Sequence, residues 1–233
     1  MLRDGGVTKN QVIEDWLALF PKFVKSRSDD RKRICLQILN GPILKYVYLD
    51  FRGEDPYVVT FGITCLVHEV AGDCVICSNK TEQKMHNQKI VTINEGLIPY
   101  YICDFHGMMN NCRKRGIDFL KPLSVSQVFN LYRSVTDLKK EFAEAPALLA
   151  SWAGMNDLAE EAAIWAEEYY EKRYEIDISE IQPKKRRKEP TLEKWREDFR
   201  SRLADRDQLQ KTFRKMVTAY MLEKTPFENI VPE

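Results

Sequence analysis

Two pairs of metal-binding residue types stand out in this chain. Cys74 and Cys77 form a Cys-x-x-Cys pair, and Cys103 and His106 form a Cys-x-x-His pair further on. Thiolate and imidazole ligands in this combination are typical of a tetrahedral structural zinc site, with bonds of about 2.0–2.3 Å. Because four protein ligands leave no open position for water, the pattern favours a zinc ion that stabilises the fold over one that catalyses a reaction. The sequence therefore predicts zinc as the cofactor.

The spacing within each pair suits a single ion. The two-residue gap between Cys74 and Cys77 fits a tight turn, and Cys103 and His106 share one face of a helical first turn. A β-hairpin is predicted between the pairs. In this order of parts, the stretch from residue 74 to about residue 115 resembles the treble-clef zinc-finger superfamily. The resemblance covers less than a fifth of the chain. It implies a zinc-stabilised module, and that fold carries many unrelated functions.

Four further residues of ligand type remain as alternatives. Cys65 and His68 are three positions apart on a predicted strand, where side chains alternate between faces, so they are not expected to share an ion. His86 lies in a polar loop and is the substitute ligand for His106. Cys112 lies six residues beyond His106, off the ligand face of that helix, and is expected in the core. The sequence leaves open whether any of the four replaces a predicted ligand.

The sequence contains no convincing active-site pattern. Some treble clefs carry a nuclease that uses further histidines and an asparagine. Here His106, Asn110 and Asn111 are the only candidates, and no histidine follows His106. No glycine-rich phosphate-binding loop is found, and the paired carboxylates within residues 157–180 are expected on a solvated helix face. We therefore expect a protein that is not an enzyme.

Short basic clusters are the second group of candidate functional residues. Five consecutive bases occupy residues 184–188, and the flanking Pro183 and Pro190 favour an extended, exposed segment. Nuclear import receptors read segments of this kind, and such segments also bind phosphates. A second cluster, residues 113–115, ends the predicted helix of the zinc module, where it can also complement the helix dipole. The candidate nucleic-acid-binding residues are Arg113, Lys114, Arg115, Lys184, Lys185, Arg186, Arg187 and Lys188.

The bulk composition is that of an ordinary globular protein, with 44% hydrophobic and 30% charged residues and a formal net charge of +1. Local charge is more informative. Residues 157–180 hold nine acids and two bases, whereas residues 184–224 hold fourteen bases and seven acids, which indicates two faces or two partners. No apolar run reaches the ~18 residues of a membrane span, and the N-terminus lacks an apolar signal-peptide core. We expect an intracellular protein with reduced thiols and no membrane partner.

The elements that position these residues make the first half of the chain α+β. Runs of β-branched and aromatic residues indicate strands, and the capping pattern Thr8-x-x-Gln11 marks a helix start. The helical spacing of Ile34, Cys35 and Ile38 indicates a helix that ends at Asn40-Gly41-Pro42. The predicted elements are helices at residues 8–21, 28–39 and 103–115, a hairpin of residues 44–51 and 57–67, and a second hairpin within residues 89–102.

The second half of the chain is predicted to be all-helical. A capping box at Ser124-x-x-Gln127 starts one helix, and two more are predicted at about 147–154 and 156–176. The last helix starts at Thr191. Its apolar stripe slips between Leu203 and Leu209, around Asp205-Arg206-Asp207, which predicts a kink or a short turn there.

These boundaries divide the chain into four regions. They are an α+β zinc-stabilised domain at residues 1–120, a helical domain at 121–182, a basic linker at 183–190 and a C-terminal helix or helical hairpin at 191–233. We predict a nuclear, zinc-stabilised protein that binds nucleic acid or regulates transcription, with a nuclear import receptor as a further partner. The alternative is a protein–protein interaction or assembly protein, viral proteins included, that oligomerises or docks through its helical half. Its acidic helix would then bind a basic surface, such as the basic C-terminal helix of a neighbour.

Overall fold

The computed structural model describes most of the chain and divides it into two compact units. The first, here called the sheet unit, comprises Met1–Ile63, Val75–Leu123 and Lys224–Asn229, and the second, the helical unit, comprises Thr64–Cys74, Ser124–Glu223 and Ile230–Glu233. The fold is α+β, with an antiparallel sheet in the N-terminal half and most helices in the C-terminal half. The described residues are 8–26, 33–51, 58–69, 73–80, 90–93, 96–99, 105–135, 138–180 and 190–231.

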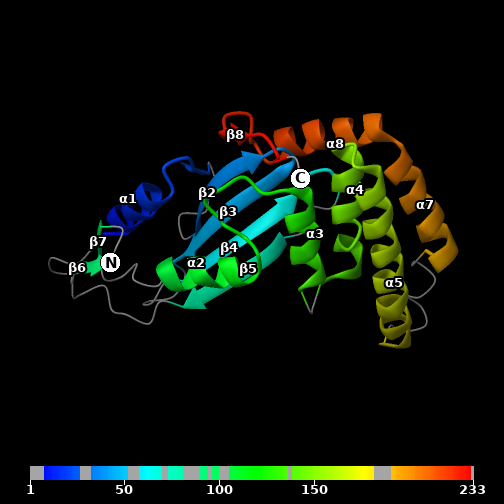
Figure 1. The fold of residues 1–233 in the computed structure, drawn as a ribbon, viewed down its shortest axis with the longest axis horizontal. Coiled ribbons are helices and arrows are strands. Elements are labelled where there is room, and N and C mark those ends of the chain that lie inside the picture. The colour runs from blue at the N-terminus through cyan, green and yellow to red at the C-terminus, as the bar shows by residue number, and fades with distance from the viewer. Residues whose placement is uncertain are drawn as a thin grey trace. The chain divides into compact units, whose positions relative to one another are not determined.

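A sheet in the strand order β1-β2-β3-β4-β5 dominates the first half of the chain (Figure 1). The register of β2 on β3 runs from Arg33 opposite Asp50 to Asn40 opposite Ile43, and the Arg33–Asp50 ion pair at 3.5 Å lies at its open end. A short strand from the C-terminal part of the chain, β8, pairs in parallel with β2. The strands are β1 (Val24–Lys25), β2 (Arg33–Asn40), β3 (Ile43–Asp50), β4 (Val58–Cys65), β5 (Asp73–Lys80) and β8 (Phe227–Glu228).

The helix predicted at residues 28–39 is wrong, because its described part is strand β2. Ile34, Leu36 and Ile38 are buried, and so are most of the residues between and after them. A strand covered on both faces reads as a near-continuous apolar run, which periodicity alone cannot distinguish from a buried helix. The predicted helix end at Gly41-Pro42 is instead the turn between β2 and β3, where Gly41 adopts a φ of 55°.

Both predicted hairpins correspond to strands that neighbour each other. Residues 44–51 and 57–67 contain β3 and β4, which are adjacent in the sheet. Residues 89–102 contain β6 (Ile90–Ile93) and β7 (Gly96–Pro99), an antiparallel pair that forms a sheet of its own. The predicted helices at the N-terminus and after Cys103 are also confirmed, as α1 (Lys9–Leu19), capped by the Thr8 side chain, and α2 (Phe105–Lys114).

An aromatic cluster forms the core of the sheet unit and orients α2. Trp16 of α1 and Phe20, which directly follows that helix, meet Phe105 of α2 at ring-centroid distances of 6.1 and 5.6 Å. Phe61 of β4 stacks on Phe119 at 4.9 Å. These rings are almost fully buried, so they contribute both apolar burial and favourable ring geometry. The packing holds one face of α2 against the core and leaves the other face outside.

The helical unit is built around α4, in which every residue from Ala145 to Ser151 is buried. This helix packs against its neighbours α3, α5, α7 and α8. The predicted capping box is present, because the Ser124 side chain and the Gln127 side chain each bond to the backbone of the other residue. The helices are α3 (Val125–Arg133), the 3-10 helix η2 (Lys140–Phe142), α4 (Ala145–Trp152), α5 (Asn156–Glu180), α7 (Leu192–Ala204) and α8 (Arg206–Ala219).

The predicted interruption of the last helix is confirmed at Asp205. This residue ends α7 and, through its side chain, accepts a hydrogen bond from the Gln208 backbone at 2.9 Å, which caps α8. Within the described part of the chain, no helix has the length and apolar character needed to cross a membrane.

Candidate functional site

The first pair of predicted zinc ligands lies in a strand. Cys74 lies inside strand β5, not in a tight turn, and Cys77 lies three positions further along the same strand. Cys74 and Ile76 are each 1% exposed, whereas the intervening Val75 is 44% exposed, so the strand alternates regularly there. Positions three apart in a regular strand lie on opposite faces.

The second predicted ligand pair is only half described. Cys103 lies outside the described residues, and His106 lies in the first turn of α2 as predicted. The buried Nε2 atom of His106 has no hydrogen-bond partner in the part of the chain that the structure describes. That part contains no group of three or more His, Cys, Asp or Glu residues arranged to hold a metal ion. Zinc therefore stays a prediction.

The alternative ligands are found in different surroundings. Cys112 is fully buried in the core face of α2, as predicted. His86 lies outside the described residues. Cys65 lies at the end of β4, and His68 lies in the turn that follows it. His68 contacts a buried carboxylate that the sequence did not predict, and the Cys65 thiol contacts the backbone of Ala145, the residue that follows this carboxylate.

That carboxylate belongs to Glu144, which directly precedes α4. Its oxygens accept hydrogen bonds from the Trp195 indole Nε1 at 2.6 Å and from the His68 ring Nε2 at 3.2 Å, and it pairs with Arg202 Nη1 at 2.6 Å. Burial by itself would raise the pKa of Glu144, but the hydrogen bonds from His68 and Arg202 and the charge of Arg202 outweigh it and lower that pKa. The centre thus holds an ionised carboxylate inside the helical unit.

The neighbourhood of Cys65, His68 and Glu144 contains the residue types of a nucleophile, a base and an orienting acid. Its chemistry is nevertheless unsuitable for thiol catalysis. The Cys65 thiol donates to the Ala145 carbonyl at 3.6 Å, and burial raises its pKa to about 12. A nucleophilic cysteine needs a lowered pKa to form thiolate near neutral pH. We therefore assign Glu144 a positional role, joining residues of α7 and the 64–74 segment to the start of α4.

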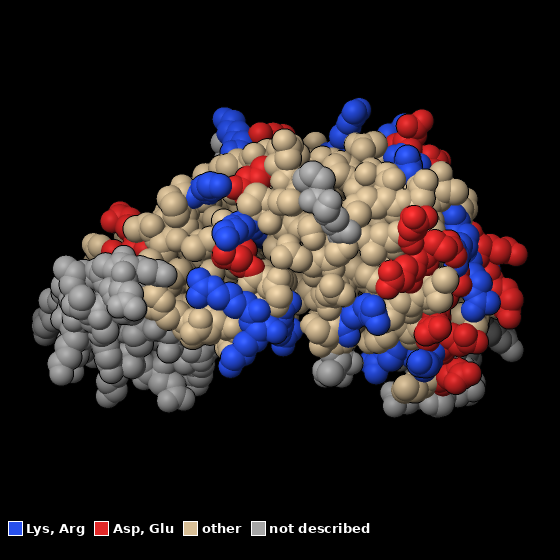
Figure 2. All heavy atoms as spheres, viewed as in Figure 1, with Lys and Arg blue, Asp and Glu red and all other residues tan. Residues whose placement is uncertain are grey.

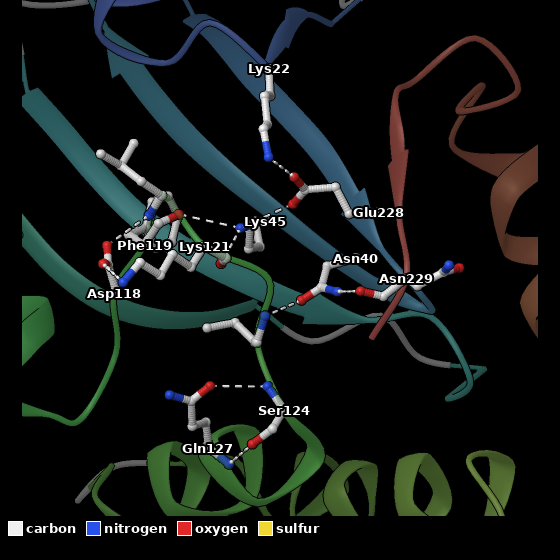
Figure 3. Close-up of polar contacts among 12 residues, drawn as sticks. Lys22, Asn40, Lys45, Asp118, Phe119, Lys121, Ser124, Gln127, Glu228 and Asn229 are labelled. Atoms are coloured by element: carbon white, nitrogen blue, oxygen red, sulfur yellow. Dashed lines mark hydrogen bonds and ion pairs between the residues drawn. The ribbon is translucent and has the colours of Figure 1, made fainter. Parts of the chain in front are cut away.

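A second buried charge, Lys45 of β3, lies in the sheet unit (Figure 3). Its Nζ donates to the carbonyls of Lys121 at 2.8 Å and Phe119 at 3.3 Å and lies 3.8 Å from the Glu228 carboxylate. Lys22 pairs with the same carboxylate at 2.7 Å. Burial lowers the pKa of Lys45 to about 8, although the charge of Glu228 opposes this shift.

Asn40 complements Lys45 by binding the same two chain segments. Its side-chain nitrogen donates to the Asn229 carbonyl at 2.9 Å, and its oxygen accepts from the Leu123 backbone N–H (Figure 3). Both Asn40 and Lys45 are fully buried. The pair therefore anchors β8 and the 117–123 loop to the sheet, and neither residue was predicted to have such a role.

The basic residues that end α2 are exposed and have no carboxylate partner among the described residues. Arg113 donates from Nη1 to the Asn110 side-chain oxygen at 3.3 Å, and Lys114 and Arg115 are exposed beside it. Within the described residues, none of the three forms an ion pair with a carboxylate. The segment 105–115 contains no acidic residue at all. Figure 2 shows Lys and Arg side chains gathered in the region of α2.

The basic residues of α7 behave differently, because they face the acidic helix α5 of the same chain. Arg200 binds Glu167 through Nε at 2.5 Å and Glu160 through Nη1 at 2.6 Å. Arg196 lies 3.8 Å from Glu167 and 3.7 Å from Glu171. In Figure 2 the acidic side chains in the region of α5 and α7 are accordingly interleaved with basic ones. Three acids of the helix that was predicted to bind a neighbour, Glu160, Glu167 and Glu171, are thus paired within the chain.

The basic segment at residues 184–188 lies outside the described residues. No protein family, curated protein or solved structure matches this chain.

Proposed function

We propose that this protein binds nucleic acid through the basic end of α2, formed by Arg113, Lys114 and Arg115. The observation that carries this proposal is that three exposed cations lie together on a helix without acids and lack carboxylate partners among the described residues. Unpaired cations of this kind attract phosphates, since neutralising each phosphate releases condensed counterions. Residues 184–188 would supply five further positive charges to the electrostatic attraction.

Salt dependence tests this proposal. Fluorescence anisotropy with the full chain and labelled DNA or RNA should show binding that weakens steeply with salt, with a log–log slope of about −0.9 per contacted duplex phosphate. Replacing Arg113, Lys114 and Arg115 with alanine should make that slope shallower, by an amount that corresponds to the loss of up to about three phosphate contacts.

A matched control is available on α8. Lys211, Arg214 and Lys215 are also exposed helical cations, but their helix, unlike α2, carries an acidic residue, Asp207. Changing the three to alanine removes the same charge. The control variant should retain most of the slope of the parent protein. Equal losses in the two variants, or no binding by the parent at about 10 μM protein and low salt, would contradict the proposal.

We also propose that residues 184–188 direct the protein to the nucleus, where a transcription-regulating role would be exercised. Five bases between two prolines support this proposal. A fluorescent fusion of the full chain should be nuclear, and changing Lys185, Arg186 and Arg187 to alanine should move it to the cytoplasm. A fusion that stays nuclear after this change would contradict the import role.

Zinc belongs to the proposal as a structural cofactor, and Cys74→Ser now tests it sharply. The predicted zinc site would lose its metal in this variant, because Cys74 is one of its four ligands. Because binding of a structural zinc ion contributes folding free energy, we expect Cys74→Ser to lose stability together with the metal. Elemental analysis of both proteins measures this. Absence of one equivalent of zinc from the parent protein, or an unchanged zinc content in the variant, would contradict the proposal.

The assembly function remains the second candidate because α5 exposes two large apolar residues. Ile164 and Ile176 are 49% and 47% exposed. Light scattering after size exclusion should show an oligomer if this surface associates, and Ile164→Asp should dissociate it. A monomer without nucleic acid would favour neither candidate function, whereas a monomer that binds nucleic acid would favour the first.

A further inference from the structure

The exposed face of α2 has a second property beyond its charge. Gly107, Asn110, Asn111 and Lys114 recur at the i, i+3, i+4, i+7 spacing of one helical stripe, and all four are exposed. The opposite face of the helix is buried in the core of the sheet unit, through Phe105, Met108, Met109 and Cys112. The helix is therefore anchored along one side and presents only glycine, amides and cations on the other.

The chemistry of this stripe matches the edges of base pairs. An asparagine amide both donates and accepts, and it can pair with the N6 and N7 atoms of adenine, while lysine and arginine bind the O6 and N7 atoms of guanine. The Arg113–Asn110 hydrogen bond at 3.3 Å links a cation to one of the two amides. An acidic side chain would repel the phosphates that border a groove, and the segment 105–115 has none.

The shape of the stripe also suits a groove. A helix of ten residues is about 15 Å long, and the major groove of B-form DNA is about 12 Å wide and admits one α-helix. Gly107 opens the stripe without a side chain, and a Cβ atom built there would have no atom within 4 Å. At this point the helix backbone can approach a ligand closely.

We propose that α2 enters the major groove of double-stranded DNA and that Asn110 and Asn111 contact base edges there. This inference rests on the proposed nucleic-acid binding and deepens it, because Arg113, Lys114 and Arg115 would supply affinity while the two amides supply sequence preference. Double-stranded RNA is a poorer fit, since the major groove of A-form helices is too deep and narrow for side chains to read.

The test begins with selection of preferred sites from a random duplex DNA pool by the full-length protein. Affinity is then measured by anisotropy for a selected duplex and for a scrambled duplex of the same composition. We expect Asn110→Ala with Asn111→Ala to lower the ratio of the two affinities by about tenfold or more. The affinity for scrambled DNA and its salt slope should stay within about threefold of the parent, because phosphate contacts remain.

A matched control removes two other exposed helical amides, Asn130 of α3 and Gln208 of α8. This variant should leave the affinity ratio unchanged. If it lowers the ratio as much as the α2 variant does, if selection enriches no sequence, or if the parent prefers RNA duplexes or single strands, the groove-reading role is overturned. Sequence-independent binding to DNA would leave the proposed function standing, whereas absence of binding to any nucleic acid would overturn both.

Gly107 gives an independent readout. Because the space around it is open, Gly107→Leu should fold with a melting temperature at or above that of the parent. In the groove the leucine side chain would keep the helix backbone away from the DNA. We therefore expect duplex affinity to fall by about tenfold or more, which is the effect of losing one well-placed contact between a side chain and a base. Unchanged duplex affinity in this folded variant would contradict entry of α2 into the groove.

Discussion

The arginines of α7 and the basic residues at the end of α2 have similar chemistry but different surroundings. Arg196, Arg200 and Arg202 each reach a carboxylate of the same chain, on α5 or at Glu144. The three cations of α2 reach none among the described residues. Within one chain, the charge that is left for a partner is thus determined by pairing, not by the density of basic residues. We expect substitutions on α7 to change stability, and substitutions on α2 to change binding.

The largest expected effect is at Glu144, where the internal pairing is most deeply buried. Glu144→Ala leaves Arg202, Trp195 and His68 without their shared acceptor, and breaking a buried ion pair from one side costs about 3–5 kcal/mol. Urea denaturation measures the loss. The control Glu168→Ala removes an exposed carboxylate of α5 and should stay within about 0.5 kcal/mol of the parent.

The pH dependence at Glu144 has a definite sign. Its pKa is lower in the folded chain than the ordinary value of 4.5, so the unfolded chain binds the proton more readily. The contribution of the ionised Glu144 carboxylate to the free energy of unfolding is present above pH 4.5. It is lost as the pH falls through the lowered pKa. Glu144→Ala should therefore lose less stability on acidification than the parent does. An equal loss in both proteins would show that the carboxylate is not ionised in the fold.

Lys45 differs from the arginines of α7, because it is a buried cation whose nearest partners are neutral carbonyls and not carboxylates. Its pKa is about 8 in the fold against 10.5 for an ordinary lysine, so the unfolded chain binds more protons between these values. The free energy of unfolding should then rise from pH 8 to pH 10.5 by about 3 kcal/mol, at 1.36 kcal/mol per pKa unit. Lys45→Met should lack this rise, as denaturation at several pH values would show.

Signals carried by a few adjacent residues were read correctly from the sequence. The Ser124–Gln127 capping box and the interruption at Asp205 depend on side chains that bond to a backbone three residues away. Strand β2 was missed because its burial is set by neighbouring strands, which local spacing does not reveal. The turn at Cys74 and Cys77 was misplaced for a related reason, since strand pairing holds both residues in β5.

The buried charges could not be derived from spacing, because their partners are far away in the chain. Glu144 bonds to His68 across 76 positions and to Trp195 across 51. The sequence nevertheless contains a feature that could have indicated both buried charges. Glu144 and Lys45 are isolated charged residues at the edge of, or within, apolar runs, at residues 143–150 and 43–49. A charge in such a position is rarely left without partners in a fold. The basic end of α2, by contrast, was visible as a run of three adjacent residues.

A smaller effect is expected at Arg200, which pairs with two carboxylates but has a side chain that is one-third exposed. Arg200→Ala should lower the free energy of unfolding by about 1 kcal/mol or less, because water and salt screen such pairs. The control Lys194→Ala changes an exposed base of the same helix and should have no measurable effect. Neither variant should alter nucleic-acid binding, and a large loss of binding in Arg200→Ala would undo the contrast between α7 and α2.

The smallest expected effect on stability belongs to the triple alanine variant of Arg113, Lys114 and Arg115. These cations lie in the last turn of α2 and just after it, where the helix dipole favours positive charge, by about 0.3–1 kcal/mol for each exposed residue at low salt. At about 0.15 M salt, screening reduces this term, so we expect the variant to stay within about 0.5 kcal/mol of the parent. Its nucleic-acid affinity should nevertheless fall. A variant that loses more than about 1 kcal/mol of stability and keeps its nucleic-acid affinity would contradict the binding role. These cations would then stabilise the fold, as the arginines of α7 do.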